Sequence, residues 1–138
     1  MTTRTETGNL ATRLHLGPLQ DRDGNALQEI KAFQEKTKTS ENAQDLVSLL
    51  ANEKIALFLA GIFAGSSYLK SLIIVDPHRL LRLLQSEPEL HFNNLVSLLR
   101  EECRVADDMP TVMKHVRTFK NELALLVALC DLGSVWPV

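Results

Sequence analysis

The stretch from Lys120 to Trp136 constrains the fold of this chain most. It begins as the end of a helix that is charged on one side, becomes apolar on every side from Leu123 to Leu129, and stops at Gly133. A helix that is apolar on every side has to be buried on every side, so other segments must surround it. The chain ends at Val138, shortly after its only Trp, and a large aromatic side chain favours a pocket. We therefore expect the chain to be part of something larger.

Apolar residues recur at helical spacing along most of the chain after residue 20, which predicts an all-α bundle of about six or seven helices with short loops. The helix boundaries are predicted by capping residues, Pro and Gly: Asn25, Ser40 or Asn42, Asn52, Gly65-Ser66-Ser67, Asp76-Pro77, Ser86-Glu87-Pro88, Asp107-Asp108-Met109-Pro110, and Gly133 as the C′ residue. The run Leu72–Val75 alone could be a buried strand. Because no other β-branched run or hairpin turn lies nearby, we interpret it as helix.

Two apolar stripes dominate the second half. Phe92, Leu95, Val96, Leu99 and Cys103 form the first, and Val112, Val116, Phe119, Leu123, Leu126, Val127 and Cys130 form the second. Residues 1–20 show no sustained period and predict a mobile N-terminal arm, whereas residues 21–138 form one helical domain. The polar N-terminus lacks the apolar segment of a signal peptide. Ile55–Val75 is mostly apolar, but only about 15 residues separate Lys54 from Lys70, too few to span a membrane.

Composition argues against several classes of function. The net charge of −2 gives no case for nucleic-acid binding. Cys103 and Cys130 lie within helical patterns and are interpreted as buried free thiols in a reducing cytosol.

A basic stripe is formed by Lys114, Arg117 and Lys120. We interpret it as a solvated face, with contact to a phosphate or an acidic protein as the alternative.

No catalytic, cofactor-binding or metal-binding residue is assigned. The acids Asp76, Glu87, Asp107 and Asp108 precede helices, where a carboxylate caps free backbone N–H groups. The four histidines, His15, His78, His91 and His115, are scattered and do not have the spacing of metal ligands. A nucleophilic pair of Cys103 or Cys130 with His115 stays open, although a thiol on an apolar stripe is expected to be inert.

Two segments carry a family resemblance. Leu59–Pro77, with the leucine-rich run to Leu84, and Phe119–Trp136 resemble the N-terminal helical region of the bifunctional glutamine-synthetase adenylyltransferase/adenylyl-removing enzymes, in particular those of alphaproteobacteria. Together the matches cover about residues 51–138. The chain departs from the family at Ser66 and Ser67, where Asn-Ser-Pro is usual, and at Ser134, which replaces a glycine.

The resemblance implies a large enzyme with two nucleotidyltransferase domains. One attaches AMP from ATP to a tyrosine of glutamine synthetase, and the other removes it by phosphorolysis, under control of the PII signalling protein. Mg²⁺ and the nucleotide would be bound by a Gly-Ser turn and paired aspartates downstream of Trp136, which this chain lacks. Gly65-Ser66 with Asp76 does not supply this motif, because the second carboxylate is absent. No catalytic residue is therefore carried over.

We expect a cytoplasmic, non-membrane fragment that supplies packing surface for the missing nucleotidyltransferase domain and is inactive alone. On this hypothesis Leu129, Val135 and Trp136 should be solvent-exposed or covered by a second copy that packs on the cut apolar face. The alternative is a free-standing helical adaptor that binds a protein through the surface around Trp136. A third hypothesis, disfavoured by the sequence, is a small cysteine-dependent enzyme.

Overall fold

The computed structural model describes residues 8–14, 25–39 and 44–135. Within these ranges the chain forms eight helices and no strand. Their bounds are α1 Leu10–Arg13, α2 Asn25–Thr37, α3 Gln44–Leu50, α4 Glu53–Gly65, α5 Ser67–Val75, α6 Pro77–Gln85, α7 Pro88–Val105 and α8 Met109–Leu132. The predicted all-α class is confirmed, and the predicted six or seven helices are close to the eight described. The run Leu72–Val75 lies in α5 and is helical, as predicted.

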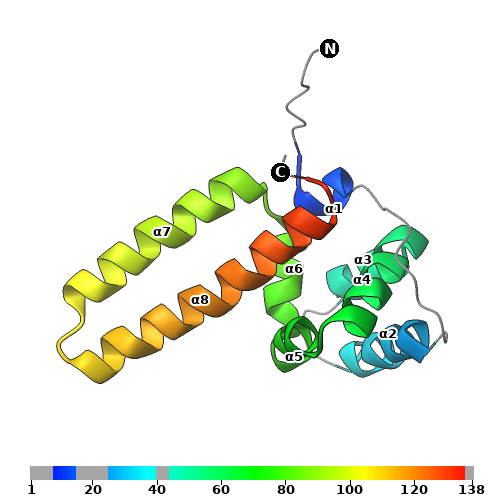
Figure 1. Cartoon of the computed structure of the whole chain (residues 1–138), viewed down its shortest axis with the longest axis horizontal. Coiled ribbons are helices and arrows are strands. Elements are labelled where there is room, and N and C mark those ends of the chain that lie inside the picture. Colours follow the sequence, from blue (N-terminus) through cyan, green and yellow to red (C-terminus); the bar gives the residue numbers. More distant parts are fainter. Residues whose placement is uncertain (1–7, 15–24, 40–43, 136–138) are drawn as a thin grey trace, which may run out of the picture.

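The helices divide into a cluster and a hairpin. Helices α1 to α6 gather at one end of the molecule, and α7 and α8 form a long antiparallel hairpin that projects from it (Figure 1). Helix α7 packs mainly against α8, whereas α8 also contacts α5 and α6. The hairpin is therefore anchored through the C-terminal part of α8.

The cluster has a continuous apolar core centred on α4. Asn52 caps this helix by accepting from the backbone N–H groups of Lys54 and Ile55. The helix is apolar around most of its circumference, and Phe58, Leu59 and Ala60 have no exposed surface. The ring of Phe63 packs edge-to-face against Phe33 of α2, with 6.3 Å between the ring centroids. Buried aromatic contacts of this kind add to the stability that the buried area provides.

Part of the predicted N-terminal arm is structured. Leu10–Arg13 is helical, Leu10 is completely buried, and its N–H donates to the carbonyl of Ser86 at 2.7 Å. Arg13 forms two hydrogen bonds, of 2.7 and 2.8 Å, with the carboxylate of Glu89 in the first turn of α7. Leu10 and Arg13 therefore pack against the rest of the fold. Residues 1–7 and 15–20 lie outside the described residues, so the arm stays a prediction there.

Local capping chemistry sets most of the helix boundaries. Asn52, Ser66, Asp76 and Asp108 each accept a hydrogen bond from the first turn of the following helix. Such caps satisfy backbone donors that have no partner within the helix. Asp76 and Asp108 are also followed by Pro in the first helical turn, as predicted.

The other predicted caps either differ from the prediction or lie outside the described residues. Glu87 occupies the N-cap position of α7, but its side chain makes no capping hydrogen bond. Asp107 lies one residue before the cap of α8, and Asn25 is the first residue of α2 rather than its cap. Ser40 and Asn42 lie outside the described residues.

The end of α8 corrects the role predicted for Gly133. Gly133 has φ −85°, and the left-handed residue is Ser134, with φ +55°. The N–H groups of Ser134 and Val135 donate to the carbonyls of Asp131 and Cys130, a Schellman motif with Ser134 at C′. Gly133 is instead required by close packing, because a Cβ there would lie 2.4 Å from Leu14 Cδ2 and 2.7 Å from the carbonyl oxygen of Leu129.

The expectation that α8 is buried on every side is wrong. Its buried residues are Glu122, Leu125, Leu126, Leu129 and Cys130, whereas Val127 and Leu132 are each 43% exposed. The exposure predicted for Leu129 is also wrong, because this side chain is completely buried. Only one face of the helix is covered by the cluster. Val135 is half-buried and packs against the core.

No single helix among the described residues is long and apolar enough to cross a membrane. Gln44–Leu50 and Glu53–Gly65 together have the length and composition of a membrane span, but a bend of 87° separates them.

Candidate functional site

The base of the hairpin is held by a polar junction of three helices. Glu122 of α8 is buried and accepts from Arg82 Nη2 of α6 at 2.6 Å. Its other oxygen lies 3.0 Å from His91 Nε2 of α7. A buried carboxylate is costly unless it is paired and hydrogen-bonded, and here both oxygens have partners. The junction therefore fixes α7 and α8 relative to α6.

A groove opens between α7 and α8 next to this junction. The cavity has a volume of about 230 Å³. Its lining is apolar in the middle and polar at the ends: Arg82, Leu95, Leu98, Leu99, Glu102, His115, Thr118, Phe119 and Glu122. Toward the tip of the hairpin, His115 Nδ1 lies 2.7 Å from Glu102 Oε2. Because each charged side chain in the lining is engaged with another, the groove is suited to packing apolar groups.

A second cavity, of about 360 Å³, lies beside α1, α3 and α4. Its lining is Ala11, Thr12, Leu14, Leu49, Asn52, Lys54 and Ile55. The carboxamide of Asn52 caps α4, and the Thr12 hydroxyl donates to the carbonyl of Asn9 at 2.9 Å. The polar groups of Asn52 and Thr12 are thus used by the fold, and Lys54 is the one charged residue of the lining.

The structure separates one of the two candidate pairs, Cys130 and His115. Cys130 and His115 lie 15 positions apart on α8, or about 22 Å along a straight helix, so they cannot pair. Burial raises the pKa of Cys130 to about 12, with a smaller contribution from Glu89, and keeps this thiol protonated at neutral pH. The prediction of a buried free thiol is confirmed for Cys130, whereas Cys103 is only half-buried. The ring of His115 pairs with Glu102.

Where the structure describes them, the acidic and metal-binding candidates offer no reactive group. Asp76 and Asp108 are engaged as helix caps. Among the described residues, no group of three or more His, Cys, Asp or Glu side chains is placed to hold a metal ion. His15 and Trp136 lie outside the described residues.

Sequence reasoning missed Glu122, although a signal for it exists. Glu122 follows Phe119 by three positions and precedes Leu126 by four, so it lies on the same helical face as two members of the second apolar stripe. An acid on an otherwise apolar face indicates a buried, paired carboxylate. The partners, Arg82 and His91, could not be deduced from this pattern.

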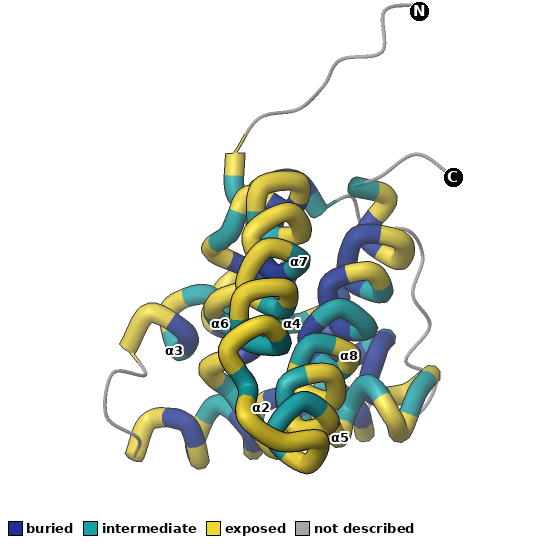
Figure 2. The backbone as a smooth tube through the Cα atoms, turned by 90° about the vertical axis from the view of Figure 1, so that its left-hand side faces the viewer, coloured by how far each residue is buried: buried dark blue, intermediate teal, exposed yellow. Residues whose placement is uncertain are grey.

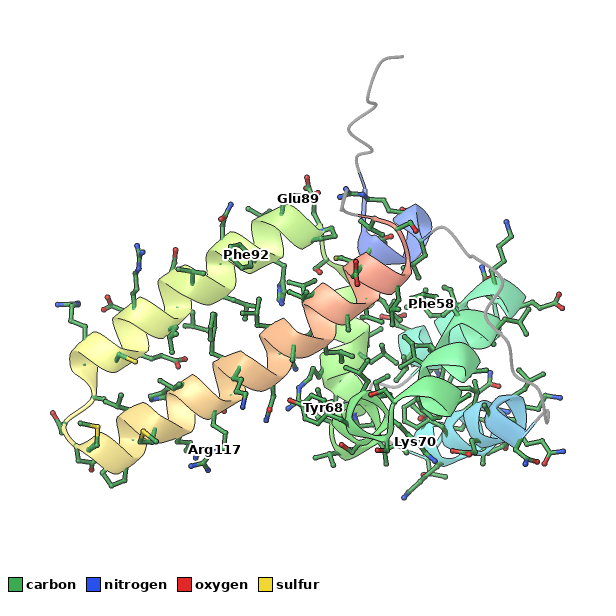
Figure 3. The ribbon with its side chains drawn as sticks, in the orientation of Figure 1. Phe58, Tyr68, Lys70, Glu89, Phe92 and Arg117 are labelled. Atoms are coloured by element: carbon green, nitrogen blue, oxygen red, sulfur yellow. The ribbon has the colours of Figure 1, made fainter. Side chains whose placement is uncertain are left out.

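The hairpin leaves much apolar surface uncovered. Within α7 only Pro88 and Leu95 are buried, and Figure 2 shows most of this helix as exposed. The exposed apolar residues of the hairpin are Leu90, Phe92, Leu98, Val105, Met109, Met113, Val116, Val127 and Leu132. The basic residues Lys114, Arg117 and Lys120 are exposed on α8, and Arg117 points away from α7 (Figure 3). A surface of this kind is typical of an interaction site.

Comparison with known proteins finds similarity to one kind of enzyme. A bifunctional glutamine synthetase adenylyltransferase/adenylyl-removing enzyme of Bradyrhizobium sp. (strain BTAi1) is 44% identical over 96 residues, which is 70% of this chain and 10% of that enzyme. The enzyme of the same name from Bradyrhizobium diazoefficiens is 46% identical over 80 residues, or 58% of this chain and 8% of the relative. A third, from Xanthobacter autotrophicus, is 33% identical over 113 residues, or 80% of this chain and 11% of the relative. The chain is homologous to a short segment of these enzymes.

The resemblance drawn from residues 59–84 and 119–136 is thereby confirmed at the level of the family. The chain spans about a tenth of the length of the curated relatives that it matches. No family model matches the chain, and no solved structure matches it either.

Proposed function

We propose that this chain is a non-catalytic helical segment of a bifunctional adenylyltransferase/adenylyl-removing enzyme, and that it supplies packing surface for a nucleotidyltransferase domain. The observation that supports this most is the match of 44% identity over 70% of the chain to an enzyme of that name. The site geometry agrees with a packing role. The acids at the helix starts serve as caps, and Glu122 is used to hold three helices together.

The proposed setting is the cytoplasm. There the whole enzyme would transfer AMP to and from glutamine synthetase, with Mg²⁺ and the nucleotide bound by its catalytic domains and with the PII protein as regulator. The segment contributes the projecting hairpin, whose uncovered apolar surface needs a partner in such an assembly.

The absence of catalysis in the chain alone can be tested directly. The purified chain is incubated with adenylylated glutamine synthetase, inorganic phosphate and Mg²⁺, and the release of ADP is measured. We expect no release above the protein-free control. Turnover that scales with the concentration of the chain would overturn the proposal, and a full-length relative serves as the positive control.

The packing role can be tested in a chimera. The segment of the Bradyrhizobium sp. enzyme that aligns with this chain is replaced by the aligned residues of this chain. We expect the chimera to retain adenylyl-removing activity, because the exchanged residues are 44% identical to those they replace. Loss of activity in a chimera that still folds would contradict the proposed role. It would favour the alternative of a free-standing adaptor.

A further inference from the structure

Five apolar residues and one lysine follow coiled-coil spacing along another face of α8. They alternate at steps of four and three residues: Met109, Met113, Val116, Lys120, Leu123 and Val127. This is the spacing of the a and d positions of a heptad repeat, in which every member faces one partner helix. We call these six residues the outer seam. It runs along about 27 Å of α8.

Most of the outer seam is left uncovered by the rest of the described residues. The residues of α8 that line the groove against α7 are His115, Thr118, Phe119 and Glu122. The residues buried against the cluster begin at Glu122. Four apolar members of the seam are exposed, from 41% at Val116 to 68% at Met109, with Met113 and Val127 between these values. Lys120 is exposed and Leu123 is half-buried. The outer seam is therefore a coiled-coil face without a partner among the described residues.

The charges around the outer seam have one sign over most of its length. Lys120 lies within the seam, and Arg117 and Lys114, three positions apart, lie along one edge. Arg117 points away from α7 (Figure 3). None of these three has an ion-pair partner among the described residues, whereas Arg82 and Arg104 are paired with Glu122 and Glu101. Exposed acids lie at its two ends, with Asp108 directly before Met109 and Asp131 one turn beyond Val127. A helix that packs here is favoured if its edge is acidic.

We propose that the outer seam docks one amphipathic helix with an apolar heptad face and an acidic edge. That helix is supplied by the part of the adenylyltransferase/adenylyl-removing polypeptide outside the matched segment, so the inference rests on the proposed function. The matched segment makes up only 10% of the Bradyrhizobium sp. enzyme, which leaves most of that polypeptide available as the source. Opposite charge along the edge sets the register of the docked helix, and the apolar seam provides the buried area.

A second copy of this chain does not fit the outer seam. Parallel pairing would place Lys120 opposite Lys120 inside the seam. Antiparallel pairing about the centre of the seam would bring Lys114, Arg117 and Lys120 of both copies within about two helical turns. Like charges placed together at an interface cost several kcal/mol, so both arrangements are disfavoured.

The charge preference can be tested with a designed probe. The probe is a fluorescent helical peptide, about three heptads long, with Ile at a, Leu at d, and Glu opposite Lys120 and along the edge that meets Arg117. Fluorescence anisotropy measures its binding to the full chain. We expect saturable binding that Lys120→Glu weakens by about tenfold or more. A probe with Lys in place of each Glu should show the reverse order of affinities.

Matched variants separate this from general charge effects. Arg100 is an exposed cation on α7, away from the outer seam, and Arg100→Glu should leave the affinity unchanged. Val116→Asp should abolish binding while the circular dichroism spectrum is preserved. Equal effects of Lys120→Glu and Arg100→Glu, or no binding by the folded wild-type chain, would overturn the proposal.

The source of the helix is tested in the chimeric enzyme. A photoreactive amino acid is placed at Val116, and the cross-linked peptides are identified by mass spectrometry. We expect a cross-link within the same polypeptide, to an acidic amphipathic helix outside the segment. A cross-linked dimer through two α8 helices, or no cross-link in an active chimera, would overturn the docking inference and leave the proposed function standing. An inactive chimera whose segment still binds the probe would instead count against the proposed function alone.

Discussion

The helical cluster and the hairpin have similar apolar periodicity but bury it differently. In the cluster, α6 has only nine residues, yet Leu80, Leu83 and Leu84 are all completely buried. In the hairpin, α7 has 18 residues and buries only Pro88 and Leu95. A short helix among several neighbours is covered, whereas a long helix with one main neighbour is not. The contrast shows that periodicity creates an apolar face, and the number of neighbours decides whether that face becomes core or remains available for binding.

The largest expected effect compares two phenylalanines. Phe58 in α4 has no exposed surface, whereas Phe92 in α7 is 38% exposed. Phe58→Ala should lower the free energy of unfolding by about 3–5 kcal/mol, because it leaves a cavity in the core. Phe92→Ala should cost no more than about 1 kcal/mol, as for other partly solvated sites. Urea denaturation followed by circular dichroism measures both, and equal losses would contradict the distinction between cluster and hairpin.

Two glycines sharpen the comparison of packing. Gly133→Ala should cost about 1–3 kcal/mol, because the new Cβ would collide with Leu14 and with the backbone carbonyl of Leu129. Gly65 has nothing within 4 Å of its added Cβ and lies at the end of α4. Gly65→Ala should therefore stabilise the protein by about 0.5 kcal/mol, since Ala loses less backbone entropy than Gly. Thermal denaturation of the two variants gives the signs, and a stable Gly133→Ala variant would argue against the close approach.

Two carboxylates compare the base of the hairpin with its tip. Glu122→Gln should lower the free energy of unfolding by about 1–2 kcal/mol, because Arg82 and His91 lose a charged acceptor in a buried position. Glu102→Gln removes only a half-exposed partner of His115 and should cost about 0.5 kcal/mol. Chemical denaturation at neutral pH measures the difference. If Glu102→Gln proves the more costly, the tip and not the base holds the hairpin together.

The two cysteines give the mildest test. At about pH 8, iodoacetamide should modify the half-buried Cys103 much faster than the buried Cys130, because burial raises the pKa of Cys130 to about 12. Mass spectrometry of the native protein measures both rates. Fast modification of Cys130 would show that the base of the hairpin opens readily.

The same pKa predicts how stability depends on pH. An exposed cysteine thiol has a pKa of 9.0, whereas burial raises the pKa of Cys130 to about 12 in the folded protein. The stability that comes from keeping this buried thiol protonated is therefore complete below pH 9.0 and falls as the pH rises toward 12. Above pH 9.0 the unfolded state binds fewer protons than the folded state, which favours unfolding. Wild type should therefore lose more stability than Cys130→Ala between about pH 8 and about pH 10.5.

The sequence was sufficient for much of what depends on neighbouring residues, although not for the caps at Asn25 and Glu87 or the C′ residue of α8. Helical periodicity gave the all-α class, and short-range chemistry placed the caps at Asn52, Ser66, Asp76 and Asp108, each within three positions of its hydrogen-bond donor. Two local motifs around residues 59–84 and 119–136 were enough to identify the related enzymes. These inferences succeed because a cap or a helical period is determined within one or two turns of chain.

Only the tertiary structure decided which apolar faces are covered. The apolar run at Leu123–Leu129 predicts a helix buried on every side, but the fold covers one face and leaves the outer seam free. The pairing of Glu122 with Arg82 joins residues 40 positions apart, and that of Arg13 with Glu89 joins residues 76 positions apart. The need for glycine at position 133 likewise comes from the approach of Leu14. Contacts of this kind depend on how whole helices are arranged, and no period within one helix records which neighbours it will have.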